Sequence, residues 1–441
     1  MKAVTKLTAG TATIGGDTPK SMGRSAVGSV RRTHKRRYIS KAVHDMAHSR
    51  LAIIGAGPTG LDAALAAADR GWPFTVYEAG DGAAANIRSW GHVRLFTPWS
   101  MNVSPRMAAH LSAAGREVPA GDDCPTGNEL ADRLLAPLTD LAELAGSIRC
   151  RARVTALGRQ GLLKHEEIAN DQRAARPFRL LVEAAGGEEV ATADAVLDCS
   201  GAYGSPNSTG DGGIPAVGEQ ALADRIVRTL PDVLADPSSW AGQRVLLVGA
   251  GHSAQTAALA LARLAAQAPG TEVVWAVRST EPTWGAVDED PLAARAGLTS
   301  EARRLAAGVP GVELRAGVVV EALADRGGRV AATLRNGTTD EVVVDRVVSL
   351  TGYVGDHNLY RQLQVHECYA TSAPMNLSAA LLGAAAGDCL QQESHGVDVL
   401  RNPEPNFFIL GAKSYGRNNQ FLMRIGWDQV DEVFGALDAA S

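Results

Sequence analysis

The 441-residue sequence predicts an α/β fold of two similar units, each a parallel sheet covered by helices and carrying an inserted β-meander. Three observations predict this fold. A short apolar stretch followed by closely spaced glycines and an alanine-rich helix occurs twice, near residues 51 and 244. Each copy continues into strands separated by turn residues, and each ends in an apolar strand that runs into a small-residue turn. We therefore expect two domains built on one plan.

The first copy begins at residues 51–60, which read LAIIGAGPTG. The G-x-G-x-x-G spacing is typical of a dinucleotide site, because its glycines permit a tight turn, close approach of a pyrophosphate and close packing of helix on strand. Glu78 ends the next apolar strand and can accept both ribose hydroxyls of an adenine dinucleotide. The residues expected to contact this dinucleotide are Gly55, Gly57, Pro58, Gly60, Glu78 and Ala79.

The second copy begins at residues 244–254, RVLLVGAGHSA, with the related spacing G-x-G-x-x-A. The following strand, 272–277, ends in Arg278 where the first copy has an acid. Because a guanidinium pairs with a 2′-phosphate, this second site is predicted to prefer NADP to NAD. The unit closes in DRVVSLTGY, residues 345–353. Its expected cofactor contacts are Gly249, Gly251, Ser253, Ala254, Arg278, Thr351 and Gly352.

The last ninety residues are predicted to return to the first unit through an apolar strand, 406–412, and a closing helix, 420–437. Gly411 at that strand end would let the backbone approach the dinucleotide, and Gly387-Asp388 is a competing candidate for the same contact. Just beyond lies a polar cluster that is either a solvated loop or part of the site: Lys413, Tyr415, Arg417 and Asn418. The expected domains are a tail at 1–48, a first unit at 49–240, a second unit at 241–350, and the return at 351–441.

An aromatic and basic string, RSWGHVRLFTPW at 88–99, follows the first dinucleotide unit. Tryptophans interleaved with arginines and a histidine suit a flat ligand that is stacked and hydrogen-bonded along its polar edge. The alternative is an aromatic corner of the core. The candidate active-site residues are Trp90, His92, Arg94 and Trp99, among which His92 would either relay a proton or be structural.

Charge is distributed unevenly along the chain. Residues 1–50 carry eleven lysines and arginines against two aspartates, in a segment with few apolar residues, so we expect a disordered basic tail. That tail could contact nucleic acid or an acidic membrane, direct targeting, or precede the true start of translation. The remainder is acidic and has no apolar run long enough to cross a bilayer. Neither nucleic acid nor membrane is therefore an expected partner of the folded part.

The five cysteines are scattered and form no C-x-x-C pair. This usage suits a reducing cytoplasm better than a disulfide framework, and it disfavours a flavoprotein that passes electrons to a pair of adjacent thiols. No metal site is expected.

With both glycine motifs, the Glu78 and Arg278 contrast and the Thr-Gly-Tyr strand end in view, the chain resembles two-dinucleotide-domain flavoproteins, above all flavin-containing and N-hydroxylating monooxygenases. Residues 345–353 are similar to the D-x-x-x-L/F-A-T-G-Y signature of the N-hydroxylating group. The resemblance implies FAD at the first unit and NADPH at the second. It implies a monooxygenase that inserts one oxygen of O2 at a nucleophilic nitrogen or sulfur of a small molecule through a C4a-(hydro)peroxyflavin.

Two other functions fit the same motifs. One is an NAD(P)H-dependent flavin oxidoreductase or dehydrogenase that inserts no oxygen, and the other is a flavin-binding redox sensor. The oligomeric state is open, and a homo-oligomer is compatible with the sequence.

Overall fold

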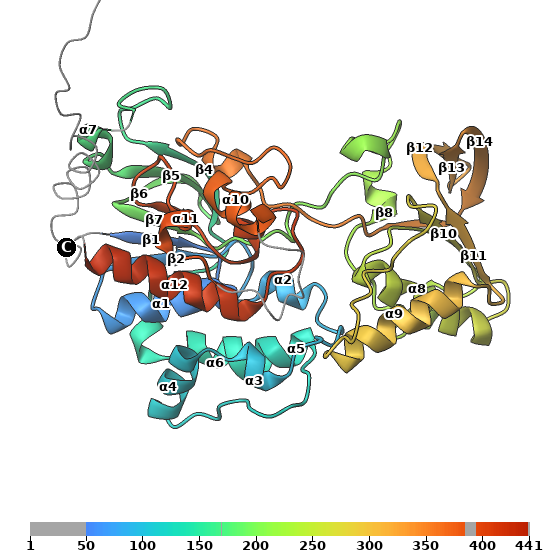
Figure 1. Cartoon of the computed structure of the whole chain (residues 1–441), viewed down its shortest axis with the longest axis horizontal. Helices are drawn as coiled ribbons and strands as arrows, with labels where there is room; N and C mark the ends of the chain where they lie inside the picture. Colours follow the sequence, from blue (N-terminus) through green and yellow to red (C-terminus); the bar gives the residue numbers. More distant parts are fainter. Residues whose placement is uncertain (1–49, 169, 384–393, 440–441) are drawn as a thin grey trace, which may run out of the picture.

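The computed structural model describes residues 50–168, 170–383 and 394–439, and within them the chain forms two lobes (Figure 1). Each lobe is built on a five-stranded parallel sheet, of order β16-β7-β1-β2-β3 in the first and β11-β10-β9-β15-β8 in the second. The predicted α/β class with two dinucleotide-type sheets is confirmed. The expectations for residues 1–48 and for Gly387-Asp388 lie outside the described residues.

The first sheet is assembled from short apolar strands that are far apart in the sequence. Its strands are β1 (Leu51–Ile54), β2 (Phe74–Tyr77), β3 (Ile148–Arg149), β7 (Ala195–Asp198) and β16 (Phe407–Ile409). Alternate residues of β1 face opposite sides, as the period of a strand requires. Leu51 and Ile53 pack toward helices α1 (Pro58–Asp69) and α12 (Met423–Asp438), while Ala52 and Ile54 join a second apolar cluster.

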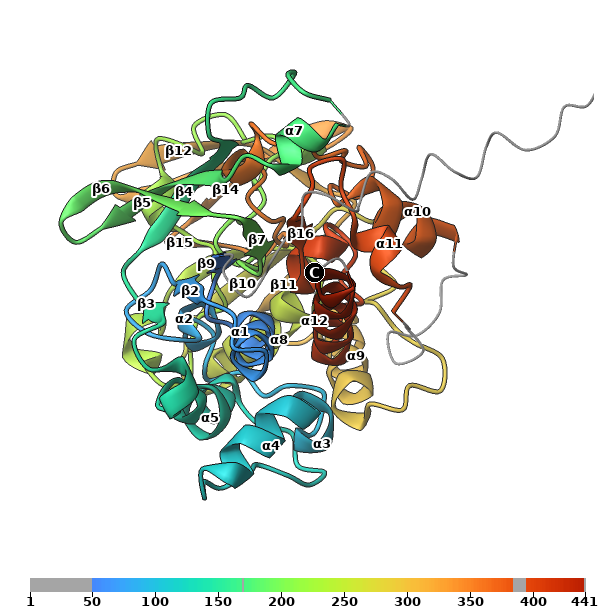
Figure 2. The same ribbon diagram turned by 90° about the vertical axis from the view of Figure 1, so that its left-hand side faces the viewer.

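That second cluster is covered by the inserted antiparallel meander β4 (Arg153–Arg159), β5 (Phe178–Ala184) and β6 (Gly187–Ala193). Phe178, Leu180 and Val182 alternate along β5 and point into it, fully buried. Figure 2 shows the meander on one side of the parallel sheet, with α1 and α12 on the other. The inserted segment therefore closes the face that the helices leave open.

A helical subdomain follows β2. It contains α2 (Ala85–Arg88), α3 (Trp99–Asn102), α4 (Pro105–Ala113), α5 (Gly127–Leu130) and α6 (Ala136–Thr139). The Thr-x-x-Glu pattern at 126–129 predicts a capping box, and Thr126 and Glu129 form it. The apolar spacing of residues 130–144 predicts that one amphipathic helix continues from this box. The chain instead forms a π-turn at Ala131–Leu135, because Pro137 has no N–H to continue the regular hydrogen-bond pattern.

The second unit repeats the plan with β8 (Ile226–Val227), β9 (Arg244–Val248), β10 (Glu272–Val277), β11 (Val312–Ala316) and β15 (Arg346–Ser349). Helices α8 (His252–Gln267) and α9 (Ala293–Ala306) cover one face. The meander β12 (Val319–Arg326), β13 (Arg329–Asn336) and β14 (Thr338–Val344) covers the other. The apolar residues of 312–322 predict one strand, but the structure has two, because Gly317 turns the chain at φ +71°.

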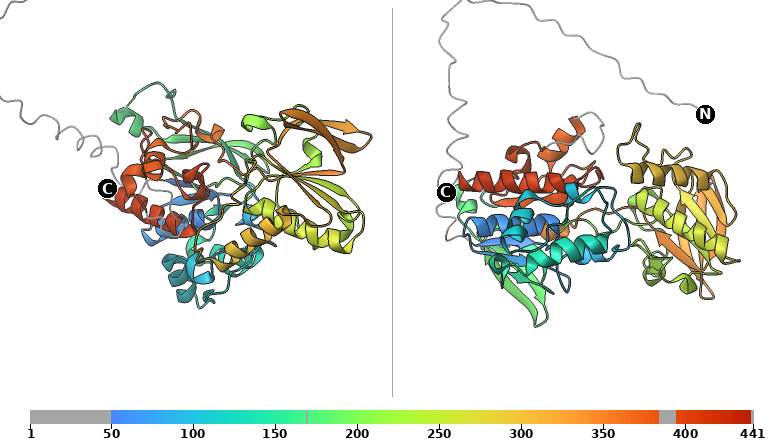
Figure 3. Two further views of the ribbon diagram at one scale, coloured as in Figure 1. Left: turned by 45° about the vertical axis from the view of Figure 1, so that its right-hand side comes forward. Right: turned by 90° about the horizontal axis from the view of Figure 1, so that it is seen from below.

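Two connections join the lobes and run beside each other (Figure 3). Asn207 of the outgoing connection donates its backbone N–H to the carbonyl of Gly352 at 2.9 Å, and its side chain donates to the carbonyl of Thr351 at 3.1 Å. β8 already pairs with β15. The second unit therefore begins at β8, earlier in the chain than the boundary at residue 241 that the sequence predicts.

The remaining short helices, α7 (Asp171–Ala174), α10 (Met375–Gly383) and α11 (Val397–Leu400), all belong to the first lobe. Among the residues that the structure describes, no helix has both the length and the apolar character to traverse a bilayer.

Candidate cofactor and active site

The first glycine turn lies between β1 and α1. Gly55 has φ +99°, and a Cβ there would stand 2.8 Å from the carbonyl oxygen of Cys199 at the end of β7. A Cβ on Gly60 would overlap the carbonyl oxygen of Gly55, so this glycine lets helix and strand pack closely. Gly57 is different, because a Cβ there would meet nothing within 4 Å. The free space needed by a ligand is thus at the middle glycine.

The N-terminus of α1 is available to an anion. Pro58 occupies its first turn, no side chain caps it, and that turn holds no acidic residue. Unsatisfied N–H groups and the helix dipole together favour a phosphate at such an end. The geometry fits the diphosphate of a dinucleotide.

Glu78 is held in place by two backbone groups. Its Oε2 accepts from the N–H of Ala56 at 2.7 Å, and its Oε1 accepts from the N–H of Gly80 at 2.7 Å. Each oxygen retains a lone pair. The half-buried carboxylate is therefore fixed beside the glycine turn with capacity to accept hydroxyl groups, while Ala79 is exposed next to it.

Gly411 brings the end of β16 to the same helix. It has φ +72°, and a Cβ there would stand 2.8 Å from Oγ1 of Thr59 in the first turn of α1. A Cβ on Gly426 in α12 would stand 2.6 Å from the same atom. Thr59 is thus enclosed by two glycine segments that the sequence places over 350 residues downstream. This close approach requires glycine at 411.

Behind this turn lies a buried ion pair. Nζ of Lys413 lies 2.6 Å from Oδ2 of Asp198, and both side chains are at most 1% exposed. The hydroxyl of Ser200 donates to the other oxygen of Asp198 at 2.6 Å. Of the polar cluster that the sequence left open, Lys413 and Tyr415 are therefore buried parts of the fold rather than a solvated loop. Burial raises the pKa of Tyr415 to about 12.

The second glycine turn repeats the first at β9 and α8. Gly249 has φ +127°, where a Cβ would overlap the carbonyl oxygen of Leu350, while a Cβ on Gly251 would meet nothing within 4 Å. No side chain caps α8. Ser253 is exposed in its first turn and Ala254 is buried against the sheet. This turn also fits a diphosphate.

Arg278 is exposed just past β10, and its guanidinium forms no hydrogen bond or ion pair within the described parts of the chain. Glu281 instead donates its backbone N–H to the Ser279 hydroxyl at 3.2 Å. The cation is therefore free to pair with a phosphate.

His252 opens α8 between the two glycine-turn regions. Its ring contacts Phe96 of the first unit edge-on, at 5.2 Å between centroids, and Nε2 is buried without a hydrogen-bond partner. Burial, followed by the charge of Arg295, lowers the pKa of His252. A neutral imidazole thus lies where the first unit meets the second.

An aromatic cluster lies at the junction of the two units. Tyr203, which follows β7, is 5.8 Å from Trp90 and 4.9 Å from Tyr353, centroid to centroid. The Tyr353 hydroxyl donates to the carbonyl of Arg228 at 2.6 Å. The indole Nε1 of Trp90 is buried and has no acceptor among the described residues. We call Trp90, Tyr203 and Tyr353 the junction cluster.

The four candidate active-site residues of the 88–99 string lie in different places in the structure. Trp90 belongs to the junction cluster, and Nδ1 of His92 lies 4.0 Å from Oδ2 of Asp232 in the segment between β8 and β9. Arg94 is exposed and turns to the carbonyl of Cys124 and to Glu129. Trp99 is 3% exposed in the core of the first unit, under the guanidinium of Arg133, which is the alternative the sequence left open.

Sequence reasoning missed several residues here: Thr59, Asp198, Ser200 and Tyr203. A signal for Asp198 existed, because it is a polar residue at the carboxyl end of a buried parallel strand, where ligand sites in α/β sheets form. Its partner Lys413 is 215 residues away, so the pair could not be found from spacing.

Comparison with solved structures shows the fold. A bacillithiol disulfide reductase from Bacillus cereus superposes with a TM-score of 0.67 at 17% identity, covering 89% of this chain and 100% of that one. The enzyme of that type from Staphylococcus aureus gives 0.64 at 16%, covering 89% and 98%. An ornithine N-hydroxylase from Kutzneria gives 0.59 at 15%, covering 89% and 99%. No curated protein sequence matches this chain.

A family model adds direct sequence support. The model of pyridine nucleotide-disulphide oxidoreductases matches residues 49–370, which include both glycine turns, Glu78 and Arg278. The flavoproteins of this family bind FAD and NADP(H), the cofactor pair that the sequence predicts. This two-lobed chain therefore belongs to the pyridine nucleotide-disulphide oxidoreductase family.

Proposed function

We propose that this oxidoreductase takes electrons from NADPH through FAD and inserts one atom of O2 at a nucleophilic nitrogen or sulfur of a small molecule. The observation that carries the proposal is the junction cluster. Trp90, Tyr203 and Tyr353 pack together where the two units meet, and the cluster contains no thiol that could receive the electrons. A junction of aromatic rings without a thiol supports reaction with O2 rather than electron transfer to a protein disulfide.

In this proposal the first unit holds FAD. Gly57 and the uncapped N-terminus of α1 would receive its diphosphate, and Glu78 would accept hydroxyls of its adenosine ribose. Gly411 would bring backbone close to the same diphosphate, since it already reaches the first turn of α1.

The second unit would hold NADPH. Gly251 and the uncapped N-terminus of α8 would receive its diphosphate, and Ser253 can donate to it. Arg278 would pair with the 2′-phosphate and so distinguish NADPH from NADH. His252, which has an unpartnered Nε2 beside Phe96, can donate or accept one hydrogen bond at the end of this site nearest the first unit.

Bound FAD supplies the electron transfer and the activation of oxygen. The protein contributes binding, orientation and exclusion of water. Trp90 offers an indole N–H that no described residue accepts, and Tyr353 is fixed by its bond to Arg228. The junction cluster therefore offers aromatic surface and one donor to a ligand that lies against it.

Two further observations support oxygen insertion. The Kutzneria ornithine N-hydroxylase, solved with reduced FAD, NADP+ and L-ornithine, shares the two-lobed fold over 89% of this chain. The described cysteines Cys124, Cys150, Cys199 and Cys368 are all free, so no disulfide is poised as an internal acceptor within the described residues.

A second candidate is an NADPH-dependent flavin reductase that inserts no oxygen. The higher TM-scores of the two bacillithiol disulfide reductases favour it. A flavin-binding redox sensor would need only the first site, and the intact second turn with Arg278 weighs against it.

The fate of the oxygen that is consumed distinguishes these functions. NADPH oxidation, O2 uptake and peroxide release would be measured together for the FAD-loaded protein, with a panel of small amines and sulfides. For a monooxygenase, a substrate speeds NADPH oxidation while peroxide per NADPH falls. If the peroxide released equals the NADPH consumed with every compound, and a disulfide or another acceptor is reduced rapidly, oxygen insertion is contradicted and the reductase is supported.

A further inference from the structure

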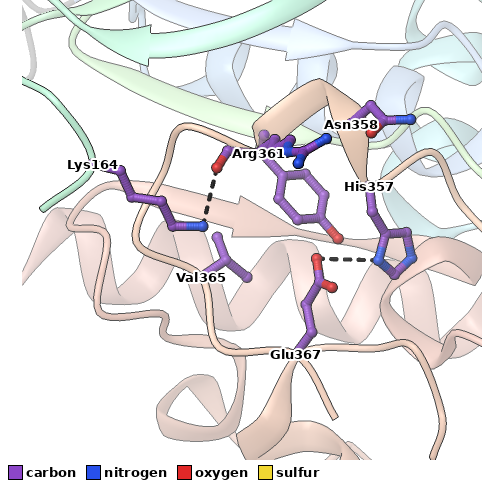
Figure 4. A pocket seen from close by; sticks show the side chains of 7 residues that line it. Lys164, His357, Asn358, Arg361, Val365 and Glu367 are labelled. Atoms are coloured by element: carbon purple, nitrogen blue, oxygen red, sulfur yellow. Dashed lines mark hydrogen bonds and ion pairs between the residues drawn. The ribbon is translucent and has the colours of Figure 1, made fainter. Parts of the chain in front are cut away.

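Two adjoining cavities form a groove on the first lobe, and no residue of either glycine turn lines them. The outer cavity, of about 360 Å³, is lined by Lys164 and by side chains of residues 357–367 (Figure 4). The inner cavity, of about 330 Å³, shares His357 and Asn358 with it. Its other walls include Ser205, Asn207 and Val354 of the two connections between the lobes. The groove is open to solvent and thus runs along the surface from the loop around Lys164 to the crossing of the connections.

The outer cavity carries an excess of cationic groups. The cations Lys164 and Arg361 line it together with the imidazole of His357, and Glu367 is its one carboxylate. Glu367 is already engaged, because Nδ1 of His357 lies 3.1 Å from its Oε1. Figure 4 shows this pair facing the space that Lys164 and Arg361 border.

The two cations have unused donors. Nζ of Lys164 donates one hydrogen bond, to the carbonyl of Arg361 at 3.0 Å, which leaves two of its three donors. The guanidinium of Arg361 has no hydrogen bond or ion pair within the described residues, so all five of its donors are free. A fork of this kind suits a carboxylate or phosphate.

Contacts of a buried carboxylate hold together the two segments that line the outer cavity. Glu404 is fully buried between Arg159 and Arg173, with N–O distances of 2.6 and 2.8 Å. Glu404 also accepts the backbone N–H of Gln364 at 2.7 Å, and the Gln364 side chain donates to the carbonyl of Lys164 at 2.7 Å. The buried carboxylate therefore ties the segment bearing Arg361 to the loop bearing Lys164.

The contacts of Glu404 also explain why the guanidinium of Arg361 has no ion-pair partner among the described residues. The nearby buried carboxylate of Glu404 is saturated by two other guanidiniums and a backbone N–H, and Glu367 is taken by His357. The segments that carry Arg361 and Lys164 are thus tied together, and neither cation has a counter-ion among the described residues. Such an arrangement is pre-organised for an external anion.

We propose that the outer cavity binds the carboxylate or phosphate group of a small organic anion, which Arg361 grips with its guanidinium and Lys164 with its ammonium group. The rest of that molecule extends along the groove toward the connections between the lobes. The proposal does not depend on oxygen insertion.

The test is a calorimetric titration of the full-length protein saturated with FAD and NADP+, so that both glycine turns are filled. Glutarate and inorganic phosphate serve as separate probes at low ionic strength. Millimolar-range binding of either probe, weakened about tenfold or more by Arg361→Gln and less by Lys164→Gln, is expected. The matched control is Arg263→Gln, an exposed arginine on α8 with no partner among the described residues, which should bind as wild type does.

The two probes identify the anion class, since stronger binding of one assigns the cavity to carboxylates or to phosphates. Absence of binding by both probes overturns the proposal. So does binding that Arg361→Gln leaves unchanged. Because Arg361 is exposed, its substitution should leave the thermal midpoint unchanged, and because no turnover is needed, the result is independent of the acceptor used by the enzyme.

Discussion

Lys413 and Asp198 form an ion pair of 2.6 Å that is almost completely removed from solvent and ties the turn after β16 to the end of β7. Gly355 of the returning connection lies directly over the Lys413 stem, where a Cβ would overlap it. The pair therefore lies at the point where the two halves of the first unit and one connection meet.

Lys413→Met should destabilise the fold by about 3–5 kcal/mol, because it leaves the Asp198 carboxylate buried without its counter-ion. Denaturant unfolding of the FAD-free protein measures this. The double variant Lys413→Met with Asp198→Asn should recover part of the loss, since no charge is then stranded. Equal stability of the single variant and the wild type would mean that Asp198 reaches water in solution.

Two glycines of the first glycine turn should respond differently to substitution, one mainly in FAD binding and the other mainly in stability. Gly57→Ala should change the unfolding free energy of the FAD-free protein by less than about 1 kcal/mol, because its Cβ would meet nothing, yet weaken FAD binding at least about tenfold by occupying diphosphate space. Gly60→Ala should cost about 1–3 kcal/mol in the FAD-free protein, because its Cβ overlaps Gly55. Unfolding curves and flavin-fluorescence titration measure the two effects. If Gly57→Ala bound FAD normally, the diphosphate would not lie at this turn.

Arg278→Ala should weaken NADPH binding by about ten- to a hundredfold, the value of hydrogen bonds to a charged group, and leave NADH nearly unaffected. The dissociation constants follow from the concentration dependence of flavin reduction by each cofactor. Arg263→Ala on the same unit is the matched control. An equal loss for NADPH and NADH would remove Arg278 from the 2′-phosphate site.

Asp62 predicts a pH-dependent stability. Burial in α1 raises its pKa from 3.8 to about 6, outweighing the opposing Arg106 guanidinium and the Ser104 hydroxyl. A carboxyl whose pKa is raised on folding contributes stability that is complete below pH 3.8 and lost as the pH rises through 6, here of order 3 kcal/mol. The stability advantage of the wild type over Asp62→Asn should therefore shrink from pH 4 to pH 7 in denaturant titrations. An advantage that grows with pH would show that Arg106 controls the group.

Local patterns predicted much of the fold. The glycine spacings, Glu78 and Arg278 depend on neighbours within about thirty residues, and both units have the predicted turns. The Thr126 capping box was equally local. The interruption of the next helix is harder to predict, because the apolar spacing of residues 130–144 is that of a continuous helix in spite of Pro137.

The rest depends on contacts between distant segments. Nothing near Lys413 indicates that Asp198 neutralises it, and nothing near Glu404 indicates that it holds two arginines from the meander. Aromatic residues are ambiguous for the same reason. Trp90 reached the junction and Trp99 the core, although both stand in one string of sequence.

The most direct test of the account is anaerobic mixing of the FAD-loaded protein with NADPH in a stopped-flow spectrometer, followed by oxygenated buffer. The account predicts rapid bleaching of the flavin with NADPH, much slower bleaching with NADH, and then an absorbing species that is neither reduced nor oxidised flavin before oxidised flavin returns. Immediate return to oxidised flavin with stoichiometric peroxide, both without substrate and with every amine and sulfide in the panel, would contradict oxygen insertion. Absence of bleaching by NADPH would contradict the two-site account itself.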